Sequence, residues 1–275
     1  MHVLISADME GATGVTWPED VTPGSDRWGY FRRLLTGDVN AAVEGFFAAG
    51  ATEVTVNEAH ASMRNLVLDQ LDARAVALVG RNKPLGMMQG VEAGCNAVAF
   101  VGYHAGAGRP GVLAHTYLGT TITGVWINRV PASEGAMNAL LAAEFGVPVV
   151  LVTGDDQTCA DAKSWAQGAE LVPVKYCVDR YTARCLPPVR TAALIREAAE
   201  RALADVRRPE PPEGPFTYEV EFDATNPVTA VTGIPGVNQA GERRVTFTLP
   251  TMAEAIRCFR TLSALAAAST EPGYG

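Results

Sequence analysis

The chain has 275 residues, of which 48% are hydrophobic and 19% are charged, and its formal net charge is −8. Such a composition is typical of a folded protein with a substantial core and excludes a disordered chain. The acidic balance, with no long run of Lys or Arg, argues against binding to nucleic acid or to an anionic membrane surface.

No targeting or membrane segment is expected from the sequence. The apolar run at residues 3–5 is followed closely by Asp8 and Glu10, so no signal-peptide core forms. No stretch approaches the ~20 apolar residues of a membrane helix. The five cysteines are odd in number and show no C-x-x-C spacing, which favours reduced thiols. We therefore expect a cytoplasmic protein that does not contact a membrane.

Up to residue 205, short strand-like runs alternate with helical patterns. Apolar and β-branched runs predict strands, and apolar residues at helical spacing predict helices. The expected strands cover 2–6, 53–56, 97–101, 125–127 and 147–153, and the expected helices cover 30–47, 134–145 and 159–168. This alternation predicts an α/β fold, a mostly parallel sheet with helices on both faces.

The pattern changes after residue 205. Residues 207–215 are rich in proline and cannot form a helix. The segments 216–222 and 244–249 alternate polar and apolar residues, as half-exposed antiparallel strands do. Thr251 and Glu254 form a T-x-x-E capping box, which predicts a helix through about Ala268. We therefore divide the chain into an α/β metal-binding catalytic domain, 1–205, and a smaller α+β unit, 206–275, suited to oligomerisation.

Acidic, amide and imidazole side chains follow nearly every strand expected in the first domain. In open α/β sheets, ligands bind at the carboxyl ends of the strands, so these side chains are expected at one edge of one sheet. The strand expected at 125–127 is included, and Asn128 and Glu134 follow it. The residues concerned are Asp8, Glu10, Asn57, His60, His104, Asn128, Glu134, Asp155 and Asp156.

Carboxylates mixed with histidines at one sheet edge indicate a metal site. Asp8 and Glu10 point to the same side of an extended chain and repel each other unless positive charge lies between them. Three of the four histidines, His60, His104 and His115, follow strand-like runs. Such ligands suit zinc, with Mn, Co or Fe as alternatives. Five ligands exceed the need of one catalytic zinc and suit two metals that share a carboxylate.

Other catalytic patterns are missing from the sequence. No phosphate-binding loop motif and no G-x-G-x-x-G fingerprint follows a strand, and no G-x-S-x-G elbow is present. The cysteines Cys159 and Cys185 have no evident histidine partner, which disfavours a cysteine nucleophile. These absences leave metal-dependent chemistry as the main hypothesis.

Six short blocks, in order along the chain, carry a family resemblance. They are SADMEG (6–11), NEAH (57–60), GYHA (102–105), AHT (114–116), EG with Asn138 (134–138) and GDD (154–156). Together they resemble the D-aminopeptidase family of zinc metallopeptidases, which includes the dipeptide-transport-operon aminopeptidase. The matched region runs from residue 6 to about 175, and the C-terminal unit is similar in plan but carries few distinctive motifs.

The resemblance implies a ring-shaped homodecamer that removes N-terminal D-residues from short peptides. It implies two zinc ions bridged by Asp8, one bound by Glu10 and His60 and the other by His104 and Glu134. It also implies a catalytic role for His115, either as nucleophile or as general acid/base, and we favour the second because metal-activated water can supply the nucleophile. Ala114 and Thr116 stand where relatives can carry serine, which bears on substrate choice.

Two competing functions remain open at this stage. The same ligands could serve a dinuclear phosphoesterase or amidohydrolase. A phosphoesterase would favour basic residues near the site, and the nearest candidates are Arg64, Arg129 and Lys175. The second alternative is a non-catalytic module that binds a solute or a metal, for which His115 would be superfluous.

Overall fold

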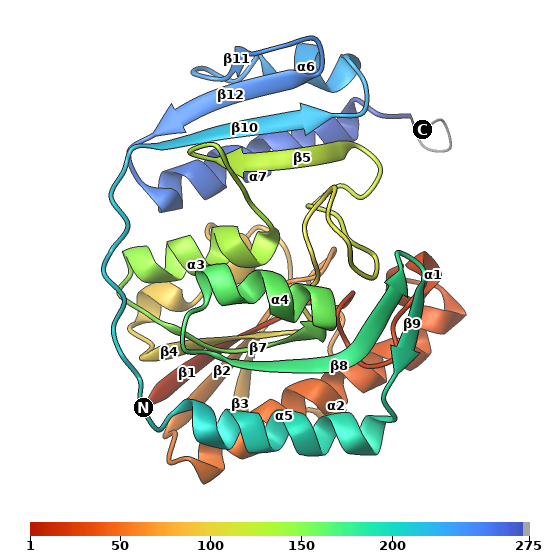
Figure 1. Ribbon diagram of the computed structural model, residues 1–275, viewed down its shortest axis with the longest axis vertical. Helices are drawn as coiled ribbons and strands as arrows, with labels where there is room; N and C mark the ends of the chain where they lie inside the picture. Colours follow the sequence, from red (N-terminus) through yellow and green to blue (C-terminus); the bar gives the residue numbers. More distant parts are fainter. Residues whose placement is uncertain (272–275) are drawn as a thin grey trace.

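A seven-stranded sheet forms the main body of the chain in the computed structural model, which describes residues 1–271 (Figure 1). Its order is β3-β2-β1-β4-β7-β8-β9. Neighbouring strands from β3 to β8 are parallel, and only β9 is antiparallel to its neighbour. The strands are β1 (His2–Ala7), β2 (Glu53–Glu58), β3 (Ala75–Leu78), β4 (Ala97–Val101), β7 (Val149–Asp155), β8 (Glu170–Asp179) and β9 (Thr182–Cys185).

Helices cover both faces of this sheet, which confirms the predicted α/β fold (Figure 1). On one face lie α2 (Asp26–Ala48) and α5 (Pro188–Ala202), and on the other lie α3 (Glu134–Glu144) and α4 (Asp156–Trp165). Side chains of β1 alternate between the two sides. Val3 and Ile5 pack with the first pair of helices, whereas Leu4 belongs to the hydrophobic cluster on the opposite face. Strands buried on both faces explain the continuous apolar runs of the sequence.

A second, antiparallel sheet of five strands lies beyond α3 (Figure 1). Its order is β11-β12-β10-β5-β6, with bounds β5 (Ile122–Ile127), β6 (Val130–Pro131), β10 (Phe216–Phe222), β11 (Asn238–Gln239) and β12 (Arg244–Leu249). The alternation of β10 buries Phe216, Tyr218, Val220 and Phe222 on one face. Its helices are α6 (Asn226–Val231) and α7 (Met252–Ala268), and Thr251 caps α7 as predicted.

The placement of β5 corrects one expectation. The run 125–127 was counted among the strands of the main sheet, but β5 pairs antiparallel with β10 from the other end of the sequence. The physical reason is that a short apolar run predicts a strand but not its partner, and this run lies between β10 and β6 in the second sheet. A strand from the first 205 residues thus completes the second sheet, and the proposed boundary at residue 205 stays a prediction.

The remaining short elements are the helix α1 (Pro18–Val21) and three 3₁₀ turns at Leu68–Gln70, Gly86–Met88 and Val91–Ala93. Residues 207–215 form an extended connector without helix, as their prolines require. Within residues 1–271, no helix combines the length and the apolar character needed to cross a membrane.

Candidate metal centre

The loop after β1 lies directly against the loop after β4, and this contact assembles the first part of the site. The Asp8 backbone N–H donates to Val101 O, and Gly11 N–H donates to Gly102 O, both at 2.8 Å. A Cβ at Gly11 would lie 1.7 Å from the Tyr103 carbonyl oxygen, so only glycine permits this approach. Asp8 and Glu10 therefore come to lie beside the residue that follows Tyr103.

The other donor side chains reach the same point from three further segments. His60 follows β2, in a turn that is fixed because Asn65 Nδ2 donates to His60 O at 2.8 Å. His104 follows β4, and Glu134 is the first residue of α3, whose N-cap is Ser133. Because β1, β2 and β4 are parallel and end at one edge, the residues that follow them meet there. Glu134 reaches the same point from the start of α3, which follows two strands of the second sheet.

Asp8 lies between two histidines. His60 Nδ1 lies 3.4 Å from Asp8 Oδ1 and 3.1 Å from Glu10 Oε2. On the other side, His104 Nε2 lies 3.4 Å from Asp8 Oδ2 and 3.5 Å from Glu134 Oε1. The donors thus fall into two groups, Asp8–Glu10–His60 and Asp8–His104–Glu134, which share Asp8, and all five side chains are buried.

Both histidines turn a lone pair toward the carboxylates. His60 Nε2 lies 2.8 Å from Val21 O, and His104 Nδ1 lies 3.0 Å from Ala105 O, so these nitrogens carry the protons. Metal-bound histidines are commonly fixed by such a hydrogen bond from the outer nitrogen. Within residues 1–271, Asp8 Oδ2 and Glu10 Oε2 are buried without a hydrogen-bond partner. The donor set therefore fits divalent cations, which would give these atoms partners.

The pKa shifts also indicate that the buried carboxylates of this cluster need positive charge beside them. Burial lowers the pKa of His60, but Glu10 and Asp8 outweigh it and raise the pKa well above normal. His104 is raised to a pKa of about 10, because Glu134, Asp8 and Glu10 outweigh burial. Burial raises the pKa of Glu134 to about 7. Without cations, the cluster would take up protons instead.

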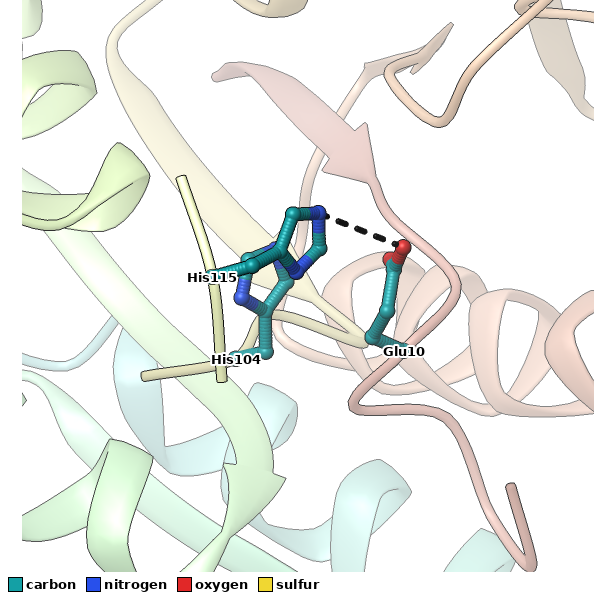
Figure 2. Close-up of side chains that lie close together, drawn as sticks. All are labelled: Glu10, His104 and His115. Carbon is teal, nitrogen blue, oxygen red and sulfur yellow. Dashed lines mark ion pairs between the residues drawn. The ribbon is translucent and has the colours of Figure 1, made fainter. Parts of the chain in front are cut away.

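His115 lies over this cluster, with its ring stacked on His104 (Figure 2). The two ring centroids are 4.2 Å apart and the planes differ by 6°. His115 Nδ1 lies 2.8 Å from Leu113 O, so Nε2 is left with its lone pair, 3.7 Å from Glu10 Oε1. Burial, then His104, lowers the pKa of His115 to about 4. A neutral imidazole therefore faces the site, and its position also permits a third donor group, Glu10–His104–His115.

A cavity of about 730 Å³ opens above the cluster. This volume lies in the range of about 300–1,000 Å³ that small-molecule sites occupy. Four of its lining residues, Ala61, Met63, Asn82 and Tyr117, have positive φ although they are not glycine. Such backbone strain collects at functional sites. The cavity is also lined by α7 of the C-terminal unit, through Arg260, Ser263, Ala264 and Ala267.

Several polar residues expected at the sheet edge have other partners. Asn57 binds the carbonyls of Gly86 and Met87, Asp155 accepts from Val112 N and Thr158 N, and Asp156 accepts from Cys177 N. Asn128 lies in the β5–β6 turn and binds Thr217 N. These residues fix neighbouring loops and lie outside the donor cluster.

The basic residues considered for phosphate binding do not line the cavity. Arg64 lines a different hollow, Arg129 is exposed in the β5–β6 turn, and Lys175 is fully buried. Two other arginines, Arg81 and Arg260, line the cavity instead. The sequence analysis did not single them out, because the short strand β3, which precedes Arg81 and ends at the donor edge, was not expected, and because Arg260 lies within α7.

Lys175 supports the loop that carries Glu10. Its Nζ donates to the carbonyls of Glu10, Ala12 and Val15 at 2.5, 3.0 and 2.6 Å. Burial lowers the pKa of Lys175 to about 8. These bonds give a buried ammonium its full set of acceptors and fix the course of the chain after β1.

The fold and this group of donors are those of a metal-dependent enzyme. A family model described as D-aminopeptidase (peptidase family M55) matches residues 1–261. A D-aminopeptidase of Bacillus subtilis (strain 168) is 30% identical over 270 residues, which cover 97% of this chain and 98% of the relative. The chain belongs to the D-aminopeptidase family, and by class it is a metallo-aminopeptidase.

A solved structure gives the same result for the fold. It is the Zn-dependent D-aminopeptidase DppA from Bacillus subtilis, described as a self-compartmentalizing protease. The TM-score is 0.94 at 29% sequence identity, and the match covers 98% of this chain and 100% of the other. The likeness therefore extends over both sheets and the connector between them.

Proposed function

We propose that this protein is a dinuclear zinc aminopeptidase that removes N-terminal D-residues from short peptides. The observation that carries the proposal is the position of Asp8, whose two carboxylate oxygens face two separate histidine–carboxylate pairs in a cavity. The zinc dependence of the similar DppA and the family description support the metal and the reaction.

Two metals would divide the donors between them. Glu10 and His60 would bind one ion, His104 and Glu134 the other, and Asp8 would bridge them, in keeping with the two groups of donor atoms. Zinc suits this mixture of carboxylate and imidazole, and Mn, Co or Fe could replace it. The metals, when bound, would lower the pKa of a water molecule and polarise the scissile carbonyl.

His115 would move the protons of the reaction. Its Nδ1 proton is used by Leu113 O, which leaves Nε2 free to take a proton from the attacking water and to pass it to the leaving amine. With two divalent ions bound, the three carboxylates of the cluster would be neutralised, so the free amino group of the substrate would bind to a metal as the neutral amine. This contact would favour exopeptidase action on peptides with a free N-terminus.

Assembly into a closed homo-oligomer, of ten chains, is part of the proposal. DppA is described as self-compartmentalizing, which supports an enclosed site here. In the single chain, Trp17, Tyr181 and Val189 are 51%, 44% and 82% exposed, and contacts between copies would remove such apolar side chains from water. Light scattering should report a closed assembly, and a stable monomer would refute this part.

The metals are tested by elemental analysis of the purified protein and its variants. The protein should contain close to two divalent ions per chain. Asp8→Ala should remove both, and His60→Ala should mainly empty one site, whereas the exposed Asp69→Ala should change nothing. Two ions per chain in Asp8→Ala would contradict the bridging role.

The reaction is tested on a panel of D- and L-aminoacyl dipeptides, their N-acetylated forms, simple amides and phosphoesters, with added zinc. Cleavage should require a free amino group and a D-residue at the N-terminus. Equal rates on N-acetylated peptides would exclude an aminopeptidase, and preferred cleavage of phosphoesters or simple amides would favour a dinuclear phosphoesterase or amidohydrolase.

A further inference from the structure

The cavity is electrically asymmetric. All of its lining carboxylates, Asp8, Glu10 and Glu134, belong to the donor cluster. Its other charged lining residues outside the cluster are Arg81 and Arg260. Within residues 1–271, neither guanidinium lies within 4.0 Å of a carboxylate. One part of the cavity therefore carries unpaired positive charge.

Arg260 is fixed in place from two sides. It extends from α7, and its Nη1 donates to the carbonyls of Lys83 and Pro84. Gly86 makes room for it, since a Cβ there would lie 2.8 Å from Arg260 Nε. Only Nη1 is used in this way, and Nε and Nη2 have no acceptor in the part of the chain that the structure describes. A positioned guanidinium with free N–H groups is a ready partner for a carboxylate.

Arg81 lies on the same loop that holds Arg260. It is exposed, makes no hydrogen bond through its side chain within residues 1–271, and precedes Lys83 by two positions. The start of this loop is tied to the metal side of the cavity, because Gly80 N–H donates to Met63 O and Met63 N–H donates to His60 O, both at 2.7 Å. The two arginines therefore meet at one loop at the border of the cavity.

A second link joins Arg260 to the donor cluster. Tyr117 N–H donates to Glu134 Oε1 at 2.7 Å, and the Tyr117 ring packs edge-on against Phe259, at 4.9 Å between centroids. Phe259 directly precedes Arg260 on α7. Tyr117 thus contacts both the donor cluster and the helix that carries Arg260, and both line the same cavity.

We propose that Arg260, assisted by Arg81, binds the C-terminal carboxylate of the substrate, so that the site selects short zwitterionic peptides by both ends. This inference rests on the proposed aminopeptidase function. Both contacts line one cavity of about 730 Å³, and a peptide advances about 3.3–3.6 Å per residue, so only a chain of few residues fits with its amino group at the cluster and its carboxylate at the arginines. Longer peptides and peptide amides lose the second contact.

The experiment compares D-alanylglycine with D-alanylglycinamide, which differ only in the terminal carboxylate. For the zinc-loaded wild-type protein, kcat/KM should be about 10- to 100-fold higher for the acid, as expected for charge-assisted hydrogen bonds. Arg260→Gln should remove most of this acid-to-amide ratio, mainly through KM. Arg81→Gln, which removes an exposed charge, should reduce the ratio by a few-fold.

The controls separate substrate binding from structural damage. Arg64→Gln, in the other hollow, should leave the ratio at its wild-type value. Arg260→Lys should restore part of it, because the charge remains without the planar fork. If Arg260→Gln fails to fold, as circular dichroism would show, the wild-type ratio and Arg81→Gln decide.

Three results are distinguishable. Failure to cleave both compounds would refute the proposed aminopeptidase. Equal cleavage of acid and amide by the wild-type protein would refute the carboxylate contact and leave the aminopeptidase standing. An unchanged ratio in both Arg81→Gln and Arg260→Gln would place the carboxylate contact on other residues and overturn the assignment.

Discussion

Asp38, on α2, should make the stability of this protein fall as pH rises from about 4 to 6. Its buried carboxyl group lies below the loop that carries the metal donors. Thr13 N–H donates to Asp38 Oδ2 at 2.8 Å, and Thr13 Oγ1 lies 2.7 Å from Asp38 Oδ1. Thr13 Oγ1 lies in turn 2.9 Å from Thr191 Oγ1, which donates to Pro188 O. A protonated Asp38 completes this chain, since each hydroxyl then donates to the next oxygen.

The size of the effect follows from the pKa. Burial raises the pKa of Asp38 from 3.8 to about 6, against the opposing effects of Thr13 and Lys175. Below pH 3.8, Asp38 is protonated in both the folded and the unfolded chain, so its ionisation costs no stability. Above pH 6, Asp38 is ionised in both states, and the folded state bears the full free-energy cost of a buried carboxylate. At 1.36 kcal/mol for each pH unit, the penalty is about 3 kcal/mol at pH 7.5 and about 1 kcal/mol at pH 4.5.

Asp38→Asn should remove this penalty, because the amide can accept from Thr13 N–H and donate to Thr13 Oγ1 as the protonated acid does. We expect its free energy of unfolding in urea to exceed that of the wild type by about 2 kcal/mol more at pH 7.5 than at pH 4.5. Both proteins are measured in the same metal state, and the exposed Asp69→Asn is the matched control. A difference between Asp38→Asn and wild type that does not change with pH would refute the reasoning.

Three further experiments test other parts of the structure. His115→Ala should keep the metals and the assembly, but its kcat should fall by about two to four orders of magnitude. If elemental analysis showed that this variant had lost metal, His115 would be a metal ligand. Lys175→Met removes the ammonium donor from three carbonyls, of which only Ala12 O keeps another donor, Val15 N–H. Stability should therefore fall by about 3 kcal/mol or more, and chelators should remove metal about 10-fold more easily. Unchanged values would contradict a supporting role. Gly11→Ala places a Cβ against Tyr103 O and should disrupt the metal centre. Its control is Gly37→Ala on α2, where a Cβ would meet nothing within 4 Å and should stabilise the protein by up to about 1 kcal/mol in thermal unfolding. Equal effects of the two substitutions would show that the close approach at Gly11 does not matter.

The sequence by itself identified the elements that reach the donor edge of the main sheet. Strands at 2–6, 97–101 and 147–153 are apolar on both faces, a pattern that only a covered parallel sheet satisfies, and the structure has β1, β4 and β7 there. Because parallel strands end at one edge, the polar residues after them indicated a common site, and Asp8, Glu10, His60 and His104 do meet. Their roles as metal ligands remain a prediction.

Other elements were not expected from the sequence. In α5 the buried residues Thr191, Ile195, Ala198 and Ala199 recur at helical spacing opposite a polar face, so this helix could have been predicted from its pattern and was missed. In β8, Pro173 and Lys175 interrupt the apolar pattern. Lys175 is buried only because carbonyls of the loop after β1 surround it, and no local pattern contains that loop.

Long-range partners were decided by the tertiary structure alone. A short apolar run such as β5 predicts a strand but does not indicate which strand it pairs with. Its partner β10 lies on the other side of the proline-rich connector in the sequence. That pairing places α7 over the cavity and brings Arg260 to the carbonyls of Lys83 and Pro84. Local sequence patterns reflect burial and backbone preference, which act between near neighbours, so they determined the donor edge of the main sheet. The arginine side of the cavity depends on contacts between distant segments, which exist only once the chain has folded.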